Sequence, residues 1–167
     1  MARTKAVVFH RALRPLLYLG CHGAHFTRTG GSGAIVTKLT ASWLKSAGAH
    51  QVMALFSDIG EPAYFVGGCV RNSLFGVPVS DLDISTPVRP ELILNLAQKA
   101  GLKVIPTGIE HGTVTVIAEG EPFEITTFRK DVETDGRRAV VAFSTQMEDD
   151  ARRRDFTMNA ISVSYTH

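Results

Sequence analysis

Residues 63–85 read AYFVGGCVRNSLFGVPVSDLDIS. The apolar run Ala63–Val66 ends in two glycines, a pattern typical of a buried strand that enters a tight turn. The next residues, Cys69–Phe75, have room for two helical turns, and they are followed by Gly76, a common helix stop. A second strand is predicted over Leu82–Ser85. The stretch therefore predicts a strand, a glycine turn, a short helix and another strand, in that order.

The flanking sequence alternates between helical and extended patterns in the same way. Helices are expected over residues 40–58, 90–100 and 145–152, the last with a capping box of Thr145 and Glu148, and from Phe156 onward. Strands are expected over residues 102–105, 113–118, 123–128 and 140–143, with a hairpin turn at residues 119–122 and a mobile loop at residues 131–138. The pattern predicts an α/β (α+β) domain, a small mixed sheet with helices packed on one side.

Two acidic residues, Asp81 and Asp83, alternate on a predicted strand, so their side chains face the same way. Two carboxylates so close repel each other unless a cation joins them. Hard oxygen ligands at this spacing suit Mg²⁺. Glu124 becomes a third carboxylate if its own strand lies beside the first, and three acids facing two Mg²⁺ ions suit phosphoryl transfer. The alternative is that the acids are solvated on an edge strand.

The glycine turn at Gly67 and Gly68 is a second candidate site, because glycines let the backbone approach an anion and a helix N-terminus offers free N–H groups. Arg71 lies in the first helical turn and can bind phosphate oxygens through two N–H groups. The alternative is an ordinary tight turn followed by a surface arginine.

Together these segments resemble the polymerase-β-like nucleotidyltransferases, in particular the bacterial-type CCA-adding enzymes and poly(A) polymerases. The resemblance runs from about Tyr64 to Ala160. Its ordered motifs are Gly67-Gly68-x-Val70-Arg71 with Leu74-x-Gly76, Asp81-x-Asp83-Ile84, Thr107-Gly108-x-x-His111-Gly112-Thr113-Val114, Glu124-x-Thr126-Thr127-Phe128-Arg129, and Arg153-Arg154-Asp155-Phe156-Thr157-x-Asn159-Ala160.

The resemblance implies a role for each of these site residues. The implied roles are metal binding at Asp81 and Asp83, a third catalytic acid at Glu124, nucleotide binding at Gly67, Gly68, Arg71 and Arg154, and a place near the ribose for Asp155. Asp155 could instead cap the final helix. Asn72 stands where the family usually has Asp, so we expect a modest loss of nucleotide affinity.

The implied reaction is attack of an RNA 3′-hydroxyl on the α-phosphate of CTP or ATP, with Mg²⁺ as cofactor, the tRNA 3′ end as acceptor and pyrophosphate as leaving group. In this family a helical neck just after the motif that corresponds to Arg153–Ala160 selects the base, and further helical domains hold the tRNA. We therefore expect this chain to bind Mg²⁺ and triphosphate weakly and not to add CCA by itself. The alternatives are a poly(A) polymerase head, an inactive fragment that binds nucleotide or RNA, and a glycosyltransferase with the same Asp-x-Asp pattern. A glycosyltransferase does not account for the flanking glycines and arginines.

Composition limits the classes of protein to which this chain can belong. The chain has 167 residues, of which 44% are hydrophobic, and two cysteines, so we expect a folded domain without a disulfide framework. Seven of its 18 Lys and Arg residues precede Asp58, the first acidic residue, which leaves 11 against 16 acidic residues. We predict a basic, disordered extension over residues 1–33, the head domain over residues 34–161 and a non-native tail over residues 162–167. We also expect a cytoplasmic location, no membrane association and no obligate protein partner.

Overall fold

The computed structural model describes residues 25–27, 36–132, 140–154 and 159–165. The elements are β1 (His25–Thr27), β2 (Val36–Lys38), the 3-10 helix η2 (Trp43–Lys45), α1 (Ala47–Ser57), β3 (Tyr64–Val66), α2 (Gly68–Phe75), β4 (Leu82–Thr86), α3 (Pro90–Lys99), β5 (Lys103–Gly108), the 3-10 helix η3 (Ile109–His111), β6 (Thr113–Ala118), β7 (Glu121–Thr127), β8 (Arg129–Val132), β9 (Val140–Phe143), α4 (Met147–Arg152) and β10 (Ser162–Ser164).

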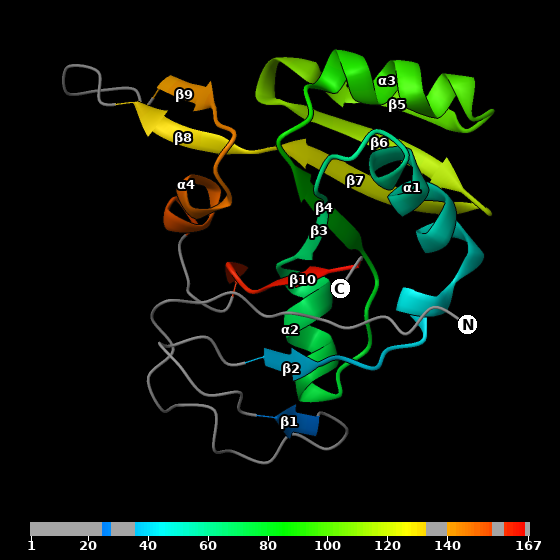
Figure 1. Ribbon diagram of the computed structural model, residues 1–167, viewed down its shortest axis with the longest axis vertical. Coiled ribbons are helices and arrows are strands. Elements are labelled where there is room, and N and C mark those ends of the chain that lie inside the picture. The colour runs from blue at the N-terminus through cyan, green and yellow to red at the C-terminus, as the bar shows by residue number, and fades with distance from the viewer. Residues whose placement is uncertain (1–24, 28–35, 133–139, 155–158, 166–167) are drawn as a thin grey trace.

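A six-stranded sheet forms the centre of the fold, in the order β10-β3-β4-β7-β6-β5. Only β4 and β7 pair in parallel within it, so the sheet is mixed, as the sequence predicts. Strands β1 and β2 form a separate antiparallel pair, and so do β8 and β9. The pair β8–β9 lies with α4 beyond one end of β7 (Figure 1).

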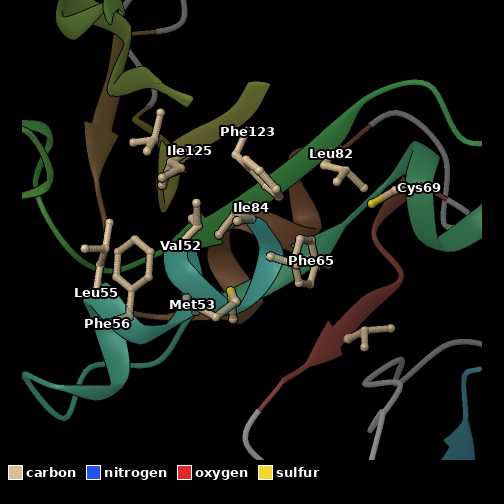
Figure 2. Packing of buried hydrophobic residues seen from close by; sticks show 14 of the residues in the cluster. Val52, Met53, Leu55, Phe56, Phe65, Cys69, Leu82, Ile84, Phe123 and Ile125 are labelled. Atoms are coloured by element: carbon tan, nitrogen blue, oxygen red, sulfur yellow. The ribbon is translucent and has the colours of Figure 1, made fainter. Parts of the chain in front are cut away.

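The hydrophobic core lies on one face of the sheet. Alternate strand residues such as Ile84, Ile125 and Val114 are buried there in one cluster, to which α1, α2 and α3 contribute Val52, Val70 and Ile93 among others. Figure 2 shows the side chains of α1 facing those of β3, β4 and β7. Because side chains alternate along a strand, the polar residues between these positions face the opposite side of the sheet. The helices therefore cover one face and leave the other for polar side chains.

The β6–β7 hairpin is closed by a two-residue turn at Glu119 and Gly120, since Ala118 pairs with Glu121. Both turn residues have positive φ, 52° and 79°, as a type I′ turn requires. The expected turn at residues 119–122 is thus correct in place and two residues too long. This tight hairpin fixes the register of β7, the strand that carries Glu124.

Most predicted elements are confirmed, with differences at their ends. The helix expected over residues 40–58 is divided into η2 and α1, because Ser46 accepts a hydrogen bond from the Ala49 N–H at 3.1 Å and caps a new helix. The capping box at Thr145 is wrong: the N-cap of α4 is Gln146, which has no side-chain cap. Instead the Ser144 hydroxyl accepts from the Gln146 N–H at 3.0 Å.

The end of the described chain differs most from expectation. The helix predicted from Phe156 falls partly on residues 155–158, outside the described residues, and Ile161 is not helical. Ser162–Ser164 form an edge strand, β10, which pairs antiparallel with β3 and buries Val163 fully. The predicted tail therefore begins with three residues that belong to the central sheet.

Two further expectations fall largely outside the described residues. The basic extension over residues 1–33 includes β1 alone among described elements, and the loop at residues 131–138 has only its first two residues described, at the end of β8. Among the residues that the structure describes, no helix has the length and hydropathy needed to cross a bilayer.

Candidate functional site

The glycine turn joins the end of β3 to the start of α2. Gly67 has φ of 76°, a conformation that L side chains rarely adopt, and it is the N-cap of α2. A Cβ at this position would lie 3.6 Å from the Asn159 carbonyl oxygen, 3.8 Å from Arg154 Nη1 and 3.9 Å from Asp83 Oδ2. Gly67 thus brings the backbone close to a carboxylate and a guanidinium. The predicted approach of an anion to this turn stays a prediction.

Asp83 and Glu124 are direct neighbours across the parallel pair β4–β7. Their side chains leave the same face of the sheet, opposite the core. Burial raises the pKa of the Asp83 carboxyl, and the charges of Glu124 and Asp81 raise it further, while Arg154 lowers it. The fold therefore gathers negative charge around one half-buried carboxylate, which is the condition under which a cation is attracted.

Asp81 lies just before β4 and is exposed, and its Oδ2 accepts a hydrogen bond from the Ser80 hydroxyl at 2.7 Å. It is near enough to raise the pKa of Asp83. Within the part of the chain that the structure describes, no three His, Cys, Asp or Glu side chains are grouped closely enough to hold a metal ion between them. The three predicted acids share one region, but they do not form a closed cage.

Arg71 leaves the first turn of α2 and is held from two sides. Its Nη1 donates to Asn159 Oδ1 at 2.7 Å, and its Nε and Nη2 donate to Asn72 Oδ1 at 3.2 and 3.1 Å. Asn72 in turn donates to the Pro78 carbonyl at 3.1 Å. Asn72 therefore holds Arg71 through a neutral amide oxygen, at the position where the family that this sequence resembles usually has Asp.

Arg154 is the second arginine of the site. Its Nε and Nη2 donate to Asp150 Oδ2 at 3.2 and 2.9 Å, and Nη2 also donates to the Ser85 hydroxyl at 3.1 Å. Its Nη1 donates to the Asn159 carbonyl at 3.4 Å. Asn159 thus contacts both arginines, through its side chain and its backbone.

Positive charge is concentrated beside these acids. Burial and the neighbouring Arg153 lower the pKa of Arg129, which lies two residues after β7 ends. Arg129 Nη1 donates to the His111 carbonyl at 3.1 Å, and its buried Nε has no hydrogen-bond partner among the described residues. Together with Arg71 and Arg154, this residue makes the polar face attractive to a group with several negative charges.

The sequence-predicted site residues come together in large part. Gly67, Asp83, Glu124 and Arg154 meet on the polar face, and Arg71 joins them through Asn159. A Cβ on Gly68 would lie 3.8 Å from Arg71 Nη2, so this glycine borders the same arginine. Asp155 lies outside the described residues.

The sequence reasoning did not single out Asp150, Ser85 or Asn159 as site residues. The spacing of Asp150 and Arg154, four residues apart, is a signal for an ion pair on a helix, but most such pairs are exposed. Asp150 is 3% exposed, which only the folded chain reveals.

Comparison with known proteins identifies the family of this chain. Residues 63–167 match the model of the poly(A) polymerase head domain. The match covers more than half of the chain and includes every predicted site residue. The chain belongs to the poly(A) polymerase head-domain family.

Two similar proteins are CCA-adding enzymes. The chain is 44% identical over 122 residues to the CCA-adding enzyme of Bacillus cytotoxicus, which covers 72% of this chain and 29% of that protein. It is 41% identical over 118 residues to the CCA-adding enzyme of Bacillus mycoides, with 70% and 29% covered. The chain thus spans less than a third of the length of these relatives.

Solved structures agree. The Bacillus stearothermophilus CCA-adding enzyme in complex with CTP superposes with a TM-score of 0.62 at 37% identity, covering 74% of this chain and 28% of that one. A tRNA nucleotidyltransferase complexed with a primer tRNA and an incoming ATP analogue superposes with a TM-score of 0.52 at 32% identity, covering 68% and 30%. The mixed sheet with helices on one side is therefore the fold of CCA-adding enzyme heads.

Proposed function

We propose that this chain is the catalytic head of a CCA-adding tRNA nucleotidyltransferase, which transfers CMP and AMP from CTP and ATP to the 3′ end of tRNA. The observation that supports this most is the joint placement of Asp83, Glu124 and Arg154 around the turn at Gly67. Phosphoryl transfer needs little covalent chemistry from the protein, and it depends on positioning and charge stabilisation. An acid pair beside a guanidinium and a glycine turn supplies both.

The arginines are the groups that would bind the triphosphate. Hydrogen bonds within the described residues occupy three of the five N–H groups of Arg71 and four of the five of Arg154. The remaining donors of both side chains are available to phosphate oxygens. The glycine turn lets the phosphates approach the start of α2, where helix N–H groups point outward.

The carboxylates fit a divalent cation. Burial raises the pKa of Asp83, and repulsion from Glu124 and Asp81 raises it further; bound positive charge would relieve this repulsion. Asp81 and Asp83 would hold Mg²⁺, which is commonly bound by one or two carboxylates together with substrate phosphates rather than by a protein cage. When bound there, the ion would supply activation of the attacking hydroxyl and neutralisation of charge on the leaving pyrophosphate. Glu124 stays a predicted third acid, and Asp155 a predicted neighbour of the ribose.

The substrates follow from relatives whose names state them. A related enzyme is seen in complex with CTP, and another with a primer tRNA and an ATP analogue. We extend these substrates to the protein that carries this head. A cytoplasmic location and the lack of an obligate protein partner stay predictions.

A comparison of nucleotides tests the proposal on this chain. Because the site offers guanidinium groups and a glycine turn, it should recognise phosphates rather than the base. In the presence of Mg²⁺, calorimetry should give CTP and ATP similar affinities, and CMP an affinity at least about tenfold lower, since charge-assisted hydrogen bonds to two phosphates are lost. Binding of CMP as tight as that of CTP would contradict the proposed site.

A further inference from the structure

One carboxylate that the proposed reaction does not use lies buried behind the site. Asp150 is in the first turn of the short helix α4, and its side chain is only 4% exposed. Its Oδ2 accepts from Arg154 Nε at 3.2 Å and from Arg154 Nη2 at 2.9 Å. Its Oδ1 accepts from the backbone N–H of Arg129 at 3.2 Å. A single carboxylate thus joins an arginine of the site to the chain that follows β7.

The guanidinium of Arg154 is fixed on both sides by this arrangement. Asp150 holds one edge of it, while the Ser85 hydroxyl on β4 accepts from Nη2 at 3.1 Å. Its Nη1 donates to the Asn159 carbonyl at 3.4 Å and lies beside Gly67, where a Cβ would be 3.8 Å away. We propose that Asp150 is a positioning residue, which holds the guanidinium of Arg154 beside Asp83 in readiness for a triphosphate.

Two physical effects favour a positioning role for Asp150: the side-chain entropy of arginine and the burial of the carboxylate. An arginine side chain loses much rotational freedom when it is ordered, and an arginine that is ordered before the ligand arrives loses less on binding. A buried carboxylate also requires positive charge beside it, because an unpaired one is strongly destabilising. Asp150 therefore fixes Arg154 in the free protein. This inference rests on the proposed function only for the identity of the ligand.

A purely structural role for Asp150 is the competing explanation, since it also accepts from the backbone of Arg129. Asp150→Asn tests this, because the single carbonyl oxygen of asparagine cannot serve both partners. Asp149→Asn is the matched control: it removes the same charge from the same helix, and Asp149 contacts Ser144 and Arg152 instead.

Nuclear magnetic resonance of the free chain gives a readout that does not depend on nucleotide. The Nε–H resonance of Arg154, assigned as the one that Arg154→Lys removes, should be sharp and protected from exchange. It should be lost or shifted in Asp150→Asn and unchanged in Asp149→Asn. Asp150→Glu keeps the charge but displaces the carboxylate by one methylene, so it should shift the same resonance while preserving the fold. An unchanged resonance in both Asp150 variants would overturn the proposal.

A double-mutant cycle then tests the consequence for binding. With Mg²⁺ present, Asp150→Asn should lower the affinity for CTP about tenfold, by analogy with the loss of a residue that hydrogen-bonds to a metal ligand. In the Arg154→Ala background the same change should have no further effect, because Asp150 acts through Arg154. An equal loss of CTP affinity in the unaltered and the Arg154→Ala backgrounds would overturn the proposal that Asp150 acts by positioning Arg154. If the unaltered chain does not bind CTP, the proposed function fails, and the resonance still decides whether Asp150 holds Arg154.

Discussion

Asp83 carries a charge that the folded chain disfavours, because burial and the neighbouring acids raise its pKa. A carboxyl whose pKa is raised on folding binds its proton more tightly in the folded state, so stability falls as pH rises through that pKa. Asp83→Asn should therefore melt at a higher temperature than the unaltered chain at pH 7, and the difference should shrink as the pH is lowered toward 4. Thermal unfolding followed by circular dichroism measures this.

The matched control for Asp83→Asn is Glu121→Gln, which removes an exposed charge from the neighbouring strand β7. It should change the melting temperature little at either pH. A lower melting temperature for Asp83→Asn at pH 7 would mean that Arg154 outweighs the repulsion, and the account of the site charge would fail.

Gly67 permits a direct separation of backbone strain from site chemistry. Gly67→Ala forces a residue with a side chain to keep φ of 76° and ψ of −126°, which costs about 1–3 kcal/mol, and it places a methyl group among Asn159, Arg154 and Asp83. Gly60→Ala imposes φ of 72°, but its Cβ meets no described atom within 4 Å.

Both glycine variants should lose stability in urea unfolding, Gly67→Ala more than Gly60→Ala, whereas only Gly67→Ala should weaken CTP binding in calorimetry. If the two variants bind CTP equally well, the turn is structural and the phosphates do not approach it.

At the scale of elements, one aromatic ring of β9 packs against the turn between η3 and β6. Phe143 packs against Gly112, where an added Cβ would lie 2.6 Å from Phe143 Cε1. The Arg89 guanidinium carbon lies over the Phe143 ring, 4.7 Å from its centroid. Gly112→Ala should therefore displace β9 and cost about 1–3 kcal/mol more than Gly101→Ala, which has a similar positive φ and open space.

Combining Gly112→Ala with Phe143→Ala separates crowding from backbone strain. The crowding disappears with the ring, so the double variant should be more stable than the sum of the single losses predicts. Urea unfolding gives the three free energies of unfolding. Strict additivity would show that the ring and the glycine are independent.

The elements also show what the sequence could predict. Strand β4 and helix α2 were predictable because glycines and alternation mark their ends locally. Strand β10 was not, because Ser162 and Ser164 give a weak strand signal and the strand forms by pairing with β3, almost a hundred residues earlier. The predicted start of α4 failed for a similar reason, since Ser144 rather than Thr145 supplies the hydroxyl.

The same limit applies to the site. The acids and arginines were predictable from their motifs, and their meeting across β4 and β7 required only that these strands be neighbours. The residues that hold these arginines in place were not predictable. Asp150 and Asn159 gain their importance from burial and from contacts with Arg154 and Arg71, which local patterns do not encode.

For the whole molecule, the central sheet extends to the end of the described chain. Val163 on β10 is fully buried in the core cluster. Val163→Ala should therefore lower the free energy of unfolding by about 2 kcal/mol, the value of burying such a side chain. Val77→Ala, at a residue that is 50% exposed, should change it little. Equal urea midpoints for the two variants would show that β10 is not part of the stable head.

The head also has a buried thiol, which should not react with a labelling reagent while the chain is folded. Burial raises the pKa of the Cys69 thiol to about 11. Because the thiolate is the reactive form, Cys69 should react with a thiol reagent at pH 8 only when the chain unfolds. Rapid labelling of Cys69 in the folded Cys21→Ser variant would contradict the packing of α2 against the sheet.

The central claim is that Asp81 and Asp83 bind a divalent cation through which this head holds a nucleoside triphosphate. The most direct measurement is calorimetric titration of CTP and ATP, with Mg²⁺ or with a chelator, into this chain and into Asp81→Ala/Asp83→Ala. We expect binding that requires Mg²⁺ and disappears in the double variant while the fold persists. Binding that survives chelation or the double substitution, or no binding by the unaltered chain, would contradict the claim.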